Sequence, residues 1–177
     1  MRLKFESSQA DVIRVMIDDL DHLVSSAVAS VFGTMLNLPV EEEAESVPAV
    51  EGEPQMAGSV GFIGVVTGVV FVYSTVSFAR KVARGMLGPD HVTTGEEMVN
   101  DAFGEITNMI VGHIKSRLAD RGMTCVLTIP SILRGSNFTI ESTSSTRRRI
   151  STFRCAGSQV VVEVLLKPNS SQTALAA

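Results

Sequence analysis

The chain has 177 residues, of which 45% are hydrophobic, so it can bury one core and we predict a single domain. The core is expected over about residues 10–167, with a flexible tail over 168–177. The net charge of −4 argues against a general nucleic-acid-binding protein, because such a protein needs a basic face to neutralise phosphates. The basic cluster of Arg147, Arg148 and Arg149 is interpreted as a solvated turn or strand end.

The N-terminal part of the chain predicts one long helix. The sequence begins MRLKFESSQADV, which lacks the apolar stretch of a secretion signal and favours a cytoplasmic protein. Apolar residues then recur every three or four positions over residues 8–36, which predicts an amphipathic helix. Pro39 ends this element, and the segment 41–53, which begins with an acidic run, is interpreted as a mobile loop or a short edge strand.

Residues 54–79 carry no charge and are numerous enough to span a bilayer. Four glycines and many β-branched residues instead favour a buried β-hairpin, with Thr67-Gly68 as its tight turn. A membrane-associated protein that uses this segment remains the alternative.

Two further helices and a group of strands are predicted in the remainder of the chain. A short helix over 77–87 should close at Gly88-Pro89, and Thr93 or Thr94 should cap a second long helix that ends near Arg121 and Gly122. Strands are expected over 124–129, 137–141, 149–155 and 159–166. Long helices beside hairpin-linked strands predict an α+β fold with helices packed on a mainly antiparallel sheet.

Standard catalytic patterns are missing from the sequence. It contains no Gly-rich phosphate loop, no nucleophile-elbow serine and no zinc-protease pair. The two cysteines, Cys125 and Cys155, are expected to be free buried thiols, with one disulfide as the alternative. His22, His91 and His113 are scattered, so no metal site is predicted.

The second long helix carries the informative pattern. With an advance of about 100° per residue, four of its residues fall within roughly 60° of one another. This polar row consists of Asp101, Glu105, Asn108 and Gly112. The opposite side carries Val99, Phe103, Ile106, Ile110 and Ile114. The plain interpretation is the solvated face of an amphipathic helix, although a mid-helix glycine costs about 1 kcal/mol relative to alanine and suggests a close approach at Gly112.

The identities and order of these residues resemble the signature of the CheX/CheC/FliY phosphatase family. The matching residues are Asp101, Glu105, Asn108, Gly112 and Pro130. The segments VFGTMLNLPVE, GFIGVVTGVVFVYST and FARKVARGMLG resemble the corresponding parts of the family, so the resemblance covers about residues 10–167. Pro130 comes one residue earlier than the family spacing. The first helix has no Glu-x-x-Asn, so the chain is similar to CheX, with one site, rather than to CheC, with two.

The resemblance implies a phosphatase that acts on the aspartyl phosphate of a CheY-like response-regulator receiver domain. Asn108 would orient the attacking water, since an amide both accepts and donates hydrogen bonds, and Glu105 would pair with the regulator's lysine. Asp101, Gly112 and Pro130 would contact the partner. The enzyme would have no cofactor of its own, because the receiver domain supplies Mg²⁺, and a homodimer formed through sheet pairing is also implied.

Two alternatives in other function classes stay open. The first is a non-catalytic adaptor or flagellar-switch-type module that docks a receiver domain without hydrolysis. The second is a small-molecule enzyme, for which the sequence offers no supporting group of residues.

Overall fold

The computed structural model describes residues 9–45, 54–64, 66–88, 95–136, 138, 140–141 and 147–168, and describes no side chains for 9–18. The helices are α1 (Gln9–Leu36), α2 (Val76–Leu87) and α3 (Glu96–Ala119). The strands are β1 (Val40–Glu42), β2 (Gln55–Gly64), β3 (Val66–Thr75), β4 (Cys125–Leu127), β5 (Ser131–Gly135), β6 (Arg147–Cys155) and β7 (Ser158–Pro168). Beyond residue 168, the predicted tail lies outside the described residues, and the extent of the single domain stays a prediction.

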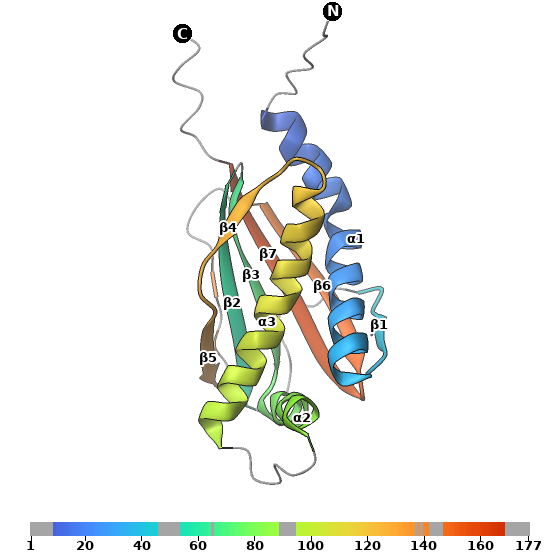
Figure 1. The fold of residues 1–177 in the computed structure, drawn as a ribbon, viewed down its shortest axis with the longest axis vertical. Helices are drawn as coiled ribbons and strands as arrows, with labels where there is room; N and C mark the ends of the chain where they lie inside the picture. The colour runs from blue at the N-terminus through green and yellow to red at the C-terminus, as the bar shows by residue number, and fades with distance from the viewer. Residues whose placement is uncertain are drawn as a thin grey trace, which may run out of the picture.

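The described strands form one antiparallel sheet in the order β1-β6-β7-β3-β2-β4, with β5 also paired to β2. Figure 1 shows α1 and α3 side by side across one face of this sheet, with α2 near the end where α3 begins. The predicted α+β fold is therefore confirmed. The first helix and the short helix also match their predicted bounds to within one residue. Of the loop or short edge strand predicted over 41–53, β1 forms a short edge strand at the beginning, and residues 46–53 lie outside the described residues.

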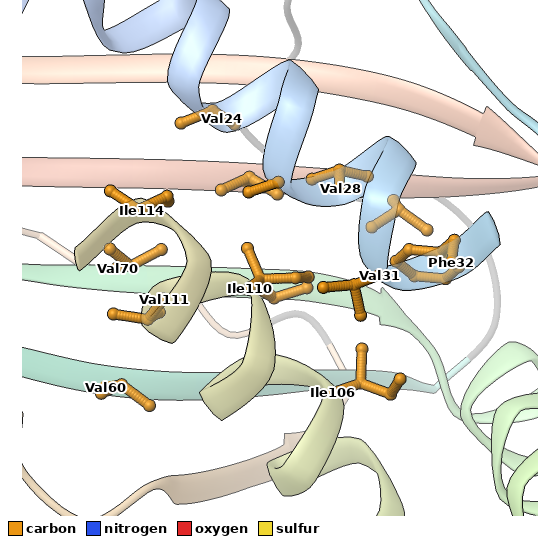
Figure 2. Packing of buried hydrophobic residues seen from close by; sticks show 14 of the residues in the cluster. Val24, Val28, Val31, Phe32, Val60, Val70, Ile106, Ile110, Val111 and Ile114 are labelled. Carbon is orange, nitrogen blue, oxygen red and sulfur yellow. The ribbon is translucent and has the colours of Figure 1, made fainter. Parts of the chain in front are cut away.

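The main core lies between the helices and the sheet. All five apolar residues predicted for the inner side of α3 are buried. In Figure 2, Ile106, Ile110 and Ile114 of α3 lie between α1 and the strands that carry Val60 and Val70. Full burial of each such side chain contributes about 1.5–3 kcal/mol, so α3 is held firmly along its length.

The ends of α3 differ in part from the prediction. Thr93 and Thr94 lie outside the described residues, and the N-cap is Gly95, which makes no side-chain capping bond, so the predicted threonine cap is wrong. Glu96 and Glu97 in the first turn instead interact favourably with the helix dipole. At the other end, α3 ends at Ala119 with Asp120 as its C-cap, two residues before the predicted end near Arg121, and Gly122 follows with a φ of 79°.

The uncharged segment forms the β2–β3 hairpin, so the hairpin prediction is confirmed. The predicted position of its turn is wrong, because β2 ends at Gly64 and Gly68 lies within β3, opposite Phe62. Gly68 is needed there for close packing: a Cβ at this position would overlap the Phe62 ring and the Leu165 carbonyl. Among the described helices, none combines the length and the apolar character that crossing a membrane requires.

The C-terminal strands also required correction. Residues 137–141 were predicted to form a strand, but described residues 138, 140 and 141 lie outside any strand, and β5 was not predicted. Pro130 separates β4 from β5, since proline cannot donate a ladder hydrogen bond. Phe138 and Ile140 instead pack on the sheet face opposite the helices, beside Tyr73. Phe138 and Ile140 therefore cover one face of the sheet and do not add a strand to it.

Candidate functional site

The polar row lies on the solvent side of an unbroken helix. Asp101 and Glu105 are exposed, and Asn108 and Gly112 are partly exposed. The side chains of Asp101, Glu105 and Asn108 form no hydrogen bond or ion pair with any residue that the structure describes. A carboxylate and an amide three residues apart therefore project together and remain available to an outside partner.

A close contact under α3 fixes the turn that carries these two side chains. Thr107 lies between Glu105 and Asn108 in the chain but is fully buried, and its hydroxyl donates to the Phe103 carbonyl at 2.8 Å. The contact requires glycine in β2, since a Cβ at Gly58 would overlap the Thr107 hydroxyl. This Gly58–Thr107 contact brings the backbone of α3 against the sheet and limits movement of the turn.

Pro130 lies against the same helix although it follows Asn108 by 22 residues in the chain. A Cβ built at Gly104 would be 3.9 Å from the Pro130 Cβ and 3.8 Å from the Ile132 Cδ1. Gly104 precedes Glu105 and lies one turn before Asn108 on the same side of the helix. The fold thus brings Pro130 beside the polar row.

Carboxylates dominate the first half of α3. They belong to Glu96, Glu97, Asp101 and Glu105. Only Glu96 has a cation near it in the described structure, with the Arg134 guanidinium 3.4 Å away. The exposed surface around Glu105 is therefore suited to receive a cation such as a lysine ammonium.

A second polar cluster lies on the sheet face opposite the helices. The Glu163 carboxylate is buried, accepts a hydrogen bond from the Tyr73 hydroxyl at 2.7 Å, and pairs with Arg148. Burial, together with the hydrogen bond to Glu163, raises the pKa of Tyr73 above its ordinary value. Each group is already paired within the cluster, so we assign it to stabilising the sheet rather than to catalysis.

The cysteines and acidic residues supply no alternative centre. Cys125 and Cys155 are free thiols, as predicted, but only Cys155 is fully buried, whereas Cys125 is partly exposed. Desolvation by burial raises the pKa of both. A raised thiol pKa lowers the thiolate fraction and so disfavours nucleophilic chemistry. Within the described ranges, no group of three His, Cys, Asp or Glu side chains is arranged to hold a metal ion.

Comparison with known proteins identifies the family. A family model described as chemotaxis phosphatase CheX matches residues 56–154, more than half of the chain. The chain belongs to the CheX family. The matched region runs from β2 into β6 and includes all of α3, the Gly58–Thr107 contact and Pro130. The resemblance predicted from the sequence is confirmed.

Individual CheX proteins agree with this assignment. The chain is 23% identical over 124 residues to the CheY-P phosphatase CheX of Thermotoga maritima, covering 68% of this chain and 80% of that protein. The crystal structure of the chemotaxis protein CheX from Desulfovibrio desulfuricans has 26% identity and a TM-score of 0.72, covering 84% and 99% of the two chains. The CheX–CheY–BeF3–Mg2+ complex from Borrelia burgdorferi shares the fold, with a TM-score of 0.65 at 22% identity, covering 82% and 96%.

Sequence reasoning missed the residues that hold the polar row in place. Gly58, Gly104 and Thr107 all occupy buried positions. One available signal was Gly104, a second glycine in the middle of α3 where a helix ordinarily carries a larger residue. Its partners Pro130 and Ile132 could not be identified without the fold, because they follow in a separate element.

Proposed function

We propose that this CheX-family chain is a phosphatase for the aspartyl phosphate of a CheY-like receiver domain. The observation that carries the proposal is the pair of unpaired side chains, Glu105 and Asn108, on one solvent-facing turn of a firmly held helix. The name of the Thermotoga maritima relative, CheY-P phosphatase CheX, supports this reaction. The Borrelia burgdorferi complex of CheX with CheY supports this class of partner.

In the proposed reaction, Asn108 enters the receiver active site and holds a water molecule in line with the phosphorus–oxygen bond of the acyl phosphate. The side-chain carbonyl accepts a hydrogen bond from the water, which leaves an oxygen lone pair directed at phosphorus. Attack forms a new phosphorus–oxygen bond and breaks the bond to the aspartate. Inorganic phosphate leaves as dihydrogen phosphate with both hydrogens of the water, and the aspartate returns as a carboxylate.

Glu105 sets the docking register in this scheme. Its exposed carboxylate pairs with the receiver lysine, and Asp101, one turn earlier, adds negative charge to the same docking surface. Gly112 lets the partner approach the helix closely, since nothing in the described structure lies within 4 Å of a Cβ built there. Pro130 borders the same surface. Mg²⁺ is held by the receiver domain, so this chain supplies orientation and charge but no metal ligand.

The deciding experiment is a phosphate-release assay with a panel of phosphorylated, Mg²⁺-loaded receiver domains. Wild type should accelerate release from at least one of them. Asn108→Ala should slow the reaction about 100-fold while binding is retained, since positioning of the water is lost. Glu105→Ala should mainly raise KM. Asp120→Ala, which removes an exposed carboxylate at the far end of α3, serves as the matched control and should behave as wild type.

The same assay tests the adaptor alternative. An adaptor predicts that a receiver domain binds but keeps its phosphate, and that Asn108→Ala changes neither property. If wild type accelerates no member of the panel and still binds one of them, the adaptor function replaces the phosphatase function.

We also infer that the chain forms a homodimer through sheet pairing. Within the described ranges, residues 147–151 of β6 pair with β7 on one side and with no strand on the other, which leaves an open edge. Light scattering should give twice the mass of one chain, and a monomer at micromolar concentration would rule the dimer out. A cytoplasmic location, with neither nucleic acid nor membrane as a partner, stays a prediction.

A further inference from the structure

Exposed apolar side chains gather at the β4–β5 edge of the sheet. They are Ile63, Val126, Ile129 and Leu133. Ile129 is the most exposed of them, at 84%, although it carries a large aliphatic side chain. A single exposed aliphatic residue is unremarkable, so its meaning depends on how it is held and on what lies beside it.

The backbone around Ile129 is held in a fixed conformation. Thr128 N donates to the Gly61 carbonyl at 2.9 Å, and Gly61 N donates to the Thr128 hydroxyl at 2.9 Å. The same hydroxyl donates to the Ile129 carbonyl at 3.2 Å. Pro130 then lies against Gly104 of α3. The 128–130 corner, made by Thr128, Ile129 and Pro130, is therefore fastened at both ends, and a partner that covers it loses little conformational entropy.

The corner borders the Asn108 side of the polar row. At about 100° per residue, Gly104 lies about 40° from Asn108 and about 100° from Glu105 around the helix axis. Since Pro130 is in contact range of Gly104, the corner lies within reach of a protein that binds at Asn108.

Other apolar residues of this edge face away from the row. Ile63 pairs directly with Val126, and Ile63 alternates with Phe62, which is buried in the core shared with the helices. Neighbouring residues on a strand point to opposite faces, so Ile63 and Val126 lie on the face without helices. Val126, at 71% exposed, is thus a matched counterpart of Ile129 in size, exposure and chain position but not in location.

We propose that Ile129 is the apolar anchor with which this chain binds the receiver domain, beside the polar row that acts on the phosphate; the inference rests on the proposed function. The receiver domain is the occupant because the exposed Pro130 packs over the buried Gly104, one turn before Asn108, so the corner adjoins the polar row. The acidic row would give orientation and register, whereas affinity would come from burial of a rigid aliphatic side chain. Ile129 thus determines how tightly the phosphorylated partner binds, not how fast its phosphate leaves.

The test measures steady-state phosphate release from a phosphorylated receiver domain whose dephosphorylation wild type accelerates. Ile129→Ala should raise KM about tenfold and leave kcat within about twofold, because it removes binding that the ground state and the transition state share. Val126→Ala should leave both constants unchanged. Both variants should unfold at the wild-type urea concentration, since neither side chain is buried.

The outcomes separate the anchor from the proposed function. If wild type is active and Asn108→Ala is inactive while Ile129→Ala keeps the wild-type KM, only the anchor is wrong. If no receiver domain is dephosphorylated by wild type, both proposals fail. A fall in kcat at unchanged KM would overturn the anchor by making Ile129 a positioning residue. Equal effects of Ile129→Ala and Val126→Ala, accompanied by a lower mass in light scattering, would assign this edge to a second copy of the chain.

Discussion

The two long helices lie side by side on the same sheet but present different chemistry to solvent (Figure 1). α1 has 28 residues and α3 has 24, and each buries one apolar side against the strands. The charged residues described on α1 are paired, with Asp19 contacting Arg121 and Asp21 lying 4.0 Å from Arg149. The row residues Asp101, Glu105 and Asn108 on α3 have no such partners among the described residues.

Most of the remaining outward residues described on α1 are small and uncharged, such as Ser26, Ala29, Ser30 and Gly33, although His22 and Met35 are also exposed. Ser25 donates to Glu42 at 2.6 Å, which holds β1 to the helix. The apolar inner side of an amphipathic helix thus determines that the helix packs on the sheet. Whether its outer polar residues are paired indicates whether they stabilise the fold or can bind a partner. The paired aspartates and Ser25 of α1 hold the fold together, whereas the row residues of α3 remain available to a partner.

Reversing one charge on each helix should give the largest difference. Glu105→Lys places a cation where the proposed partner presents its lysine, so KM for phosphate release should rise about 100-fold. Asp21→Lys makes the same change in net charge on α1 and loses only an exposed ion pair, so KM should stay within about threefold of wild type. The measurement is KM at low and high salt, and the Glu105→Lys effect should shrink as salt rises. Equal effects of the two variants would show that net charge alone controls binding.

A side chain added at Gly58, beneath α3, should have the next largest effect on phosphate release. In Gly58→Ala the new methyl group meets the buried Thr107 side chain, so we expect a loss of about 1–3 kcal/mol in the free energy of unfolding and a lower phosphate-release rate. Urea unfolding measures the first effect. The matched control is a double-mutant cycle with Thr107→Ala, which removes the overlapped group and should show a favourable coupling. Strictly additive effects would mean that the two residues do not contact each other.

This contact also shows where sequence reasoning stops. Apolar periodicity predicted α1 and the outward direction of the polar row on α3, because a helix repeats over residues that are close in sequence. The Gly88-Pro89 stop signal marked the end of α2. The Gly58–Thr107 contact joins residues 49 positions apart (107 − 58) and leaves no local pattern. Pro130 was identified from the family signature, but only the fold places it beside Gly104.

Glycine and short apolar runs account for the errors made from sequence. Gly68 was predicted to be a turn residue, but it allows close packing against Phe62. A tight turn and a close contact both require glycine, so the sequence alone does not distinguish them. Alternation over 137–141 predicted a strand because apolar residues at every second position also suit a segment that lies across a sheet. In each case tertiary packing decided between structures with the same local pattern.

Replacement of Gly112 by alanine should have the smallest effect, and it should stabilise the fold while weakening binding of the partner. Nothing in the described structure lies within 4 Å of a Cβ at Gly112 or at Gly33 of α1, so alanine at either position should raise the free energy of unfolding by about 1 kcal/mol. At Gly112 the methyl group also stands in the polar row, where the proposed partner approaches, so KM should rise about threefold. Gly33→Ala should stabilise the chain without a change in KM. If Gly112→Ala stabilises equally and leaves KM unchanged, the partner does not approach α3 at this turn, and the docking surface ends at Asn108.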